Sequence, residues 1–344
     1  MNRTTSLADM LVVGLLLGGA FWARGQAPDG AVLKSEFIAD DMPTPSCHAS
    51  TIVESDGKLL AAWFGGKREG DKSVGIWLSR HDGERWGKPI EVANGEWTDG
   101  TRYPCWNPVL FQPTAGPLML FYKVGPSPSR WWGMLMTSSN AGETWSKPQK
   151  LPEGFLGPIK DKPIELAGGT ILCGSSTEDQ GWRLHVEWTR DLGQTWDKTG
   201  PLNDRTLGAI QPTFLRLSEN ALGLVCRSQR AGKVLFAKSM DLGRTWGELT
   251  PLDVPNPNSG IDATTLADGR HLMVYNDTPR GRTPLNVGLS EDGMKWRNVL
   301  ALESEAGEYS YPAVIQAKDG KVHVTYTWRR EKVKHAVIDA AKLK

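Results

Sequence analysis

Short apolar stretches recur along almost the whole chain and are separated by turns rich in Gly, Asp and Pro; examples are KLLAAWF, LMLFYKV, LGLVCRS and VHVTYTW. These stretches are rich in β-branched and aromatic residues and have the length of strands. The 3.6-residue spacing that marks an amphipathic helix is almost absent. The pattern therefore predicts a nearly all-β protein of many short strands.

A polar turn of the form Ser/Thr-x-Asp-x-Gly-x-Thr-Trp follows these strands five times. The best copies are SSNAGETW, TRDLGQTW and SMDLGRTW, and the looser ones are SRHDGERW and SEDGMKW. In such a turn the Asp or Asn side chain can accept backbone N–H bonds, Gly supplies a positive φ, and Trp covers the hairpin. The copies end at tryptophans spaced 59, 51, 50 and 50 residues apart, namely Trp86, Trp145, Trp196, Trp246 and Trp296.

A period near 50 residues indicates a repeated sheet that cannot bury both of its faces alone. We therefore predict an all-β, six-bladed β-propeller. Five blades carry the turn, and the sixth combines the residues after about Gly307 with the N-terminal strand in SEFIAD, which removes an exposed sheet edge. No linker indicates a second domain, so residues 28–344 are predicted to form one catalytic propeller.

The first 27 residues have the pattern of a secretory signal peptide. A basic residue near the start precedes an apolar core from about Met10 to Ala23, and the small residues Gly25 and Ala27 follow in a cleavage-like arrangement. An uncleaved anchor is the alternative. We expect a secreted or periplasmic protein without stable membrane insertion after cleavage.

The charge balance and the cysteines limit the partners further. Lys and Arg total 40 and Asp and Glu total 39, so no overall field favours nucleic acid. Cys47 and Cys105 are the favoured disulfide pair in a secreted protein, whereas Cys173 and Cys226 are expected to be buried free thiols. The six histidines are scattered without ligand-like spacing, so neither a metal nor a cofactor is expected.

Polar and aromatic segments constrained by Gly and Pro occur once or twice in each predicted blade, where loops would converge on the propeller axis. Aromatic faces stack on sugars and Arg forks bind carboxylates, so this mixture predicts a glycan substrate with an acidic sugar. The substrate-binding candidates from these segments are Arg68, Arg102, Trp106, Asn107, Trp132, Lys160, Lys162, Asn258, Asp262, Glu308 and Tyr309, and Trp131 is a further candidate for stacking.

The five turns resemble the BNR or Asp-box repeats of the sialidase superfamily, and this resemblance covers nearly the whole chain after the signal. It implies a propeller in which three arginines bind the substrate carboxylate, a Tyr assisted by a Glu is the nucleophile, and an Asp is the acid/base. The residues here that match the Tyr, the second arginine, the third arginine and the Asp are Tyr311 in YPAVIQAKDG, Arg227 in LVCRS, Arg282 or Arg280, and Asp71.

Two positions depart from the family pattern. His48, in CHAST, stands where the first arginine is expected, and Gln211, in IQP, stands where the Glu is expected. Gln cannot act as a base, and His is a poor substitute for a bidentate guanidinium. An unperturbed His titrates near neutrality, so His48 is a candidate acid/base instead.

Three functions follow from these residues. The first is an exo-acting glycoside hydrolase for a terminal acidic sugar, with Tyr311 as nucleophile and Asp71 as acid. The second is a lyase for a uronate-containing glycan, in which His48 and Tyr311 or Tyr309 transfer protons while Arg227, Arg282, Lys160 and Lys162 neutralise the acid. The third is a glycan-binding propeller without catalysis.

Overall fold

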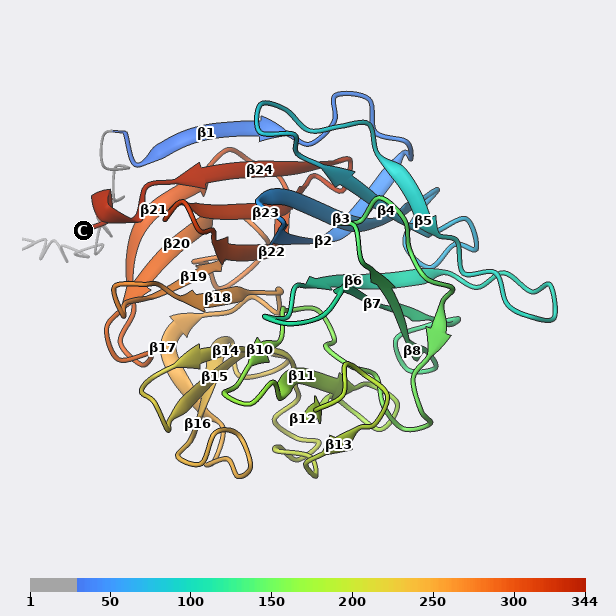
Figure 1. Ribbon diagram of the computed structural model, residues 1–344. Helices are drawn as coiled ribbons and strands as arrows, with labels where there is room; N and C mark the ends of the chain where they lie inside the picture. The colour runs from blue at the N-terminus through green and yellow to red at the C-terminus, as the bar shows by residue number, and fades with distance from the viewer. Residues whose placement is uncertain (1–29) are drawn as a thin grey trace, which may run out of the picture.

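The computed structural model describes residues 30–344, so the predicted signal segment 1–27 lies outside the described residues. Its strands form six four-stranded antiparallel sheets around a central axis (Figure 1). The prediction of an all-β, six-bladed propeller is confirmed. Within the described part, a search for helices able to cross a membrane finds none.

Each blade runs from an innermost strand at the axis to an outermost strand at the rim. Blade 1 comprises β2 (Ser46–Ser55), β3 (Lys58–Gly66), β4 (Gly75–Arg80) and β5 (Ile90–Ala93), and blade 2 comprises β6 (Cys105–Phe111), β7 (Leu118–Val124), β8 (Trp132–Ser138) and β9 (Gln149–Lys150). Blade 3 comprises β10 (Ile164–Glu165), β11 (Ile171–Thr177), β12 (Arg183–Thr189) and β13 (Asp197–Lys198), and blade 4 comprises β14 (Ala209–Arg216), β15 (Leu222–Ser228), β16 (Lys233–Ser239) and β17 (Thr250–Pro255). Blade 5 comprises β18 (Asp262–Thr265), β19 (His271–Tyr275), β20 (Leu285–Ser290) and β21 (Arg297–Glu303).

Blade 6 joins the two ends of the chain, as predicted. It comprises β22 (Tyr309–Gln316), β23 (Val322–Trp328), β24 (Lys332–Ile338) and, outermost, β1 (Val32–Phe37). In Figure 1 the blue β1 lies beside the red β24, and a 3-10 turn, η1 (Ala340–Lys342), follows. The antiparallel pairing of β1 with β24 fastens the last blade and covers its outer edge.

The blades pack face to face, and the hydrophobic core lies between them rather than at one centre. Leu215 and Val225 of blade 4, for example, share a cluster with Met273 of blade 5. Every residue of β7 and of β15 is buried. Strands buried on both faces read as continuous apolar runs, which explains why the sequence shows little alternation.

The predicted Asp turns connect the third and fourth strands of blades 1 to 5. In the blade 3 turn, Asp191 accepts hydrogen bonds from the Thr195 N–H at 2.8 Å and from its hydroxyl at 2.6 Å. The Trp196 indole donates to the Gly193 carbonyl at 2.9 Å, and Gly193 has a φ of 95°. These hydrogen bonds, chiefly those from Thr195, lower the pKa of Asp191 to about 2.

The four cysteines are buried and free, so the expected Cys47–Cys105 disulfide is not formed. Cys47 packs in a cluster that joins blades 6 and 1, whereas Cys105 packs between blades 1 and 2. The two thiols therefore belong to different inter-blade layers. Burial raises the pKa of Cys47 to about 12. The expectation of buried free thiols at Cys173 and Cys226 is confirmed.

We expect Asp241→Ala to lower the free energy of unfolding by about 1 kcal/mol, because the partly solvated carboxylate is the acceptor for its turn. Asp241 accepts from the Thr245 N–H at 2.9 Å and from the Thr245 hydroxyl at 2.6 Å. Asp253→Ala is the control, since the exposed Asp253 contacts only the Lys233 ammonium. Equal denaturation midpoints for the two variants would show that the hydrogen bonds of Asp241 do not stabilise the fold.

The folded protein is expected to lose stability in mild acid because of a buried histidine on β24. His335 on β24 is opposite Glu36 on β1, and burial lowers the pKa of His335 to about 4, although Glu36 opposes this. Between about pH 6.5 and 4 the unfolded chain therefore binds a proton that the folded chain does not, and stability falls as the pH falls through this range. We expect a loss of about 2 kcal/mol between about pH 7 and 5, measured by denaturant unfolding. His335→Gln should show a shallower loss, and an unchanged pH dependence would contradict this assignment.

Candidate active site

Four innermost strands carry a bulge at the same end of the axis. The residues at these bulges are Ala49, Asn107, Gln211 and Tyr311, with φ values of 52°, 37°, 56° and 51°. Proline follows three of them and cannot donate to the ladder. A left-handed conformation costs roughly 1–3 kcal/mol for a non-glycine residue and is common at functional sites. The site is completed by residues from the loops that follow the second strands of the blades.

Tyr311 of blade 6 lies at the centre of this constellation. Its hydroxyl oxygen accepts from Arg227 Nη1 at 2.7 Å and from Gln211 Nε2 at 3.3 Å, both of blade 4. Arg227 is oriented by a 2.8 Å hydrogen bond from its Nε to the Asn258 side-chain oxygen. Because the Tyr311 oxygen accepts both bonds, its own hydrogen remains free to be donated to another group.

His48 lies directly against Tyr311, with 4.1 Å between the ring centroids. Its Nδ1 is 3.0 Å from the Thr327 hydroxyl, and its Nε2 is buried without a partner among the described residues. When Nδ1 carries the proton and donates to Thr327, Nε2 holds the free electron pair. Burial lowers the pKa of His48 well below its usual value, and the positive charges that add to this are Arg330, Arg282, Arg227 and Lys160, in that order.

Arginines and carboxylates surround this pair. Glu308 accepts from Arg282 Nη1 and from Arg330 Nε, each at 2.8 Å. Arg330 also forms an ion pair with Glu69, which belongs to the loop after β3. The two arginine charges lower the pKa of Glu308 and outweigh its burial. In this state, protein carboxylates therefore occupy the guanidinium forks of Arg282 and Arg330.

Arg330 was not among the site residues predicted from the sequence. Its carbonyl accepts from the Cys47 N–H at 2.8 Å, which fixes it next to His48. Arg329 and Arg330 have φ values of 53° and 60°, so two adjacent non-glycine residues are left-handed in this hairpin. The YTWRR segment was the available signal, but its turn geometry and its contact with blade 1 depend on the folded structure.

Lys160 supports the site instead of lining it, contrary to the prediction. It is buried, and its ammonium donates to Asp161 and, at 2.8 Å, to the carbonyls of Ile261 and Pro312. These bonds use all three of its N–H groups. Burial raises the pKa of Asp161 although the Lys160 ammonium opposes this. Lys160 thus fastens the strand that carries Tyr311.

Lys162 and Asp262 are also placed away from the predicted substrate position. Lys162 Nζ lies 3.0 Å from both oxygens of Asp262, which also accepts the Val314 N–H at 2.7 Å. Lys162 borders a cavity of about 770 Å³ lined by the far ends of innermost strands, including Val53 and Ile315. This pair joins blades 3 and 5, and Asp262 also contacts blade 6 through the Val314 N–H.

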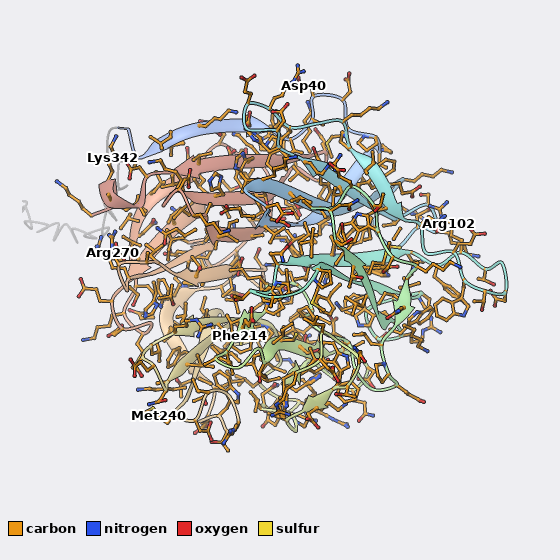
Figure 2. The ribbon with its side chains drawn as sticks, viewed as in Figure 1. Asp40, Arg102, Phe214, Met240, Arg270 and Lys342 are labelled. Atoms are coloured by element: carbon orange, nitrogen blue, oxygen red, sulfur yellow. The ribbon has the colours of Figure 1, made fainter. Side chains whose placement is uncertain are left out.

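Three further predicted residues lie outside the central cluster. Tyr309 is buried in the core between blades 5 and 6. Arg102 lies at the rim of the molecule, as Figure 2 shows, and pairs with Glu91 at 3.3 Å. Trp132 packs edge-on against Trp97, with 4.9 Å between centroids. Their sequence segments were suitably polar or aromatic, but the side chains point elsewhere.

The loop after β3 presents a different carboxylate to the centre than the sequence predicted. Asp71 accepts from the Ser73 N–H at 2.8 Å and from the Ser73 hydroxyl at 2.6 Å, and these bonds lower the pKa of Asp71. Glu69 of the same loop reaches Arg330 instead. Arg68 and Arg280 are exposed on loops.

The comparisons with known proteins agree with this architecture. The family model described as BNR repeat-like domain matches residues 57–324. The chain belongs to this family. The predicted BNR-repeat resemblance is confirmed by this family model, and the solved structures that share the propeller fold include sialidases. No curated protein matches the chain.

Three solved structures define the fold similarity. A Hadza microbial sialidase is 17% identical with a TM-score of 0.77, over 90% of this chain and 69% of that one. A protein of unknown function from Dyadobacter fermentans is 16% identical with a TM-score of 0.75, over 90% and 98%. The intramolecular trans-sialidase of Ruminococcus gnavus, in complex with oseltamivir carboxylate, is 13% identical with a TM-score of 0.72, over 91% and 99%. At these identities the likeness establishes the fold alone.

Burial lowers the pKa of His48, so we expect this ring to stay neutral well below the pH near 6.5 at which an ordinary His titrates. Arg330→Gln should raise the pKa of His48, because it removes the positive charge that acts most strongly on this ring, while Arg282, Arg227 and Lys160 remain. Arg329→Gln is the control, since Arg329 stacks on Trp328. NMR of labelled histidine side chains measures the pKa of His48 in each variant. An equal change of this pKa in both variants would contradict the role of Arg330.

Proposed function

We propose that this protein is a carbohydrate-active enzyme that cleaves a glycan next to an acidic sugar by β-elimination. The observation that carries the proposal is the contact of the buried His48, whose Nε2 has no partner among the described residues, with Tyr311, whose hydroxyl hydrogen is free; burial lowers the pKa of His48 and favours its neutral form. A base and an acid in contact, within a ring of arginines, suit proton abstraction beside a carboxylate.

The arginines are proposed to bind the carboxylate of the acidic sugar. Arg227, Arg282 and Arg330 offer forked donors, and a carboxylate can accept two parallel bonds from such a fork. Glu308 and Glu69 now occupy two of the forks, so a substrate carboxylate would take the place of these side chains. The Ruminococcus gnavus neighbour, whose ligand is named a carboxylate, supports this class of ligand.

In the proposed reaction His48 Nε2 takes the proton from the carbon next to the carboxylate. The bond between the neighbouring carbon and the glycosidic oxygen breaks, a carbon–carbon double bond forms, and Tyr311 gives its proton to the leaving oxygen. Arg227 and Gln211, which donate to the Tyr311 oxygen, would stabilise the negative charge left there. The proton on His48 then returns to Tyr311, and no water is consumed.

Hydrolysis of a terminal acidic sugar is the second candidate. The 2.7 Å bond from Arg227 to the Tyr311 oxygen favours it, because the same positive charge would activate Tyr311 as a nucleophile. It ranks second because Gln211, which cannot accept the tyrosine proton as a base, contacts Tyr311, and because Asp71 is bound within its own loop. A secreted or periplasmic location is part of the proposal and rests on the pattern of residues 1–27.

The test is to incubate the protein with uronate-containing glycans and sialosides while recording near-ultraviolet absorbance and product masses. We expect an unsaturated acidic product, which absorbs in the near ultraviolet and is lighter by one water than a hydrolysis product. His48→Ala and Tyr311→Phe should each reduce turnover by about 100-fold or more, because each removes a proton-transfer group.

A product that contains the added water would replace elimination by hydrolysis. Binding of these glycans without turnover would make the propeller a glycan-binding protein. Full turnover in His48→Ala would remove His48 from the mechanism even if the product were unsaturated. Arg329→Ala is the control for general effects of substitutions in the same loops, because Arg329 is exposed and stacks on Trp328.

A further inference from the structure

A pocket of about 340 Å³ lies between blades 2 and 3, beside the proposed centre. Its lining includes the aromatic residues Trp131, Trp132 and Phe155 and the acidic residues Glu153, Glu178 and Asp179. It is formed by the loop between β7 and β8, the segment after β9 and the residues after β11. A concave site with aromatic walls and a few polar groups is typical of ligand binding.

Two paths connect this pocket with the centre. Glu178 lines the pocket and is close enough to Trp182 and Arg227 for both to oppose the burial that raises its pKa. The Arg227 guanidinium in turn lies 4.9 Å from the Trp182 ring centroid. On the other side a row of aromatic contacts runs from the centre to the pocket; it consists of His48 and Phe64 at 5.7 Å, Phe64 and Trp106 at 6.1 Å, and Trp106 and Trp131 at 6.0 Å.

Trp131 is held in a fixed position. Gly125 has a φ of 153°, and a Cβ at this residue would lie 2.4 Å from Trp131 Cα, so only glycine lets the loop fold back so closely. The Trp106 indole, which the sequence predicted as a sugar platform, donates to the Gly125 carbonyl at 2.8 Å and fixes the same loop. The indole N–H of Trp131 has no partner among the described residues.

The charges in the pocket differ from those at the centre. Three carboxylates line the pocket, and its one ammonium, from Lys150, lies 5.5 Å from the Trp132 ring and 5.9 Å from the Trp97 ring. Carboxylates accept hydrogen bonds from sugar hydroxyls, whereas they repel a second acidic sugar. Trp131 can stack on the apolar face of a pyranose.

From the pocket and its position we infer that it binds an uncharged pyranose joined to the acidic sugar that occupies the arginines. This inference rests on the proposed function and makes it more specific. The bond that is cleaved would join an acidic sugar to a neutral one, and chains made only of uronates would be poor substrates.

The experiment measures binding of lactose, cellobiose and digalacturonate by calorimetry. We expect a neutral disaccharide to bind, with affinity about tenfold weaker in Trp131→Ala and largely kept in Trp131→Phe, because phenylalanine retains a stacking face. Glu178→Gln should admit digalacturonate better than the unaltered protein does. Trp188→Ala is the matched control, since Trp188 is a half-buried tryptophan that borders a different pocket.

Failure of both neutral disaccharides to bind would overturn the inference, as would unchanged binding of these sugars in Trp131→Ala. His48→Ala separates this result from the proposed reaction. If His48→Ala still binds the neutral disaccharide, the assignment of the pocket is supported whether or not elimination occurs. If turnover occurs but the pocket binds no neutral sugar, only the pocket assignment fails.

Discussion

The contact between the first and last blades is the constraint on which the candidate site depends. His48 and Ala49 of blade 1 meet the Thr327 hydroxyl of blade 6, and the Cys47 N–H bonds to the Arg330 carbonyl. These partners are close to 280 residues apart in the chain, so His48, Tyr311 and Arg330 come together only when the propeller closes. The pairing of β1 with β24 secures this closure, because it attaches the N-terminal strand to blade 6 just before the chain enters blade 1. Fold stability and assembly of the site are therefore coupled.

The closed ring holds strained backbone residues and several charged side chains close together, which short peptides could not do. Gln211 and Tyr311 are left-handed on strands that are otherwise regular, and each side chain is thereby directed to the other across the axis. Lys160, which is buried beneath Tyr311, holds the strand through the Pro312 carbonyl. Burial keeps His48 neutral amid these positive charges. Burial and the neighbouring cations act in the same direction, because both disfavour the charged imidazole and lower the pKa of His48.

The architecture could be predicted from the sequence because the same turn motif and apolar runs recur from blade to blade. The spacing of the Asp turns predicts the number of blades, because each turn is formed by residues close together in the chain. The apolar runs predict the strands, because the strands are buried on both faces of the blades. The positions of Tyr311, Arg227 and His48 near one another also follow the expectation, because each occupies a position that the family pattern places around the substrate. Arg330, Glu69 and Glu178 were not predictable, because their roles depend on which loops meet after closure. Tyr309 was misplaced because the bulge that follows it in β22 decides which side chains face the axis, and Asp262 was misplaced because its contacts with Lys162 and the Val314 N–H form only between blades.

The two departures from the sialidase pattern are best understood together. Replacing an arginine by His48 removes a positive charge, and replacing a glutamate by Gln211 removes a negative one, so the net charge around Tyr311 is kept. What changes is the set of groups that can exchange a proton with Tyr311: the family's carboxylate is absent, and the imidazole of His48 lies 4.1 Å from the tyrosine ring. Arg330 supplies a guanidinium from blade 6, close to where the family pattern has its first arginine. In the proposed reaction this exchange keeps guanidinium groups for a substrate carboxylate and pairs Tyr311, as the acid, with His48, as the base, which is the combination that elimination requires.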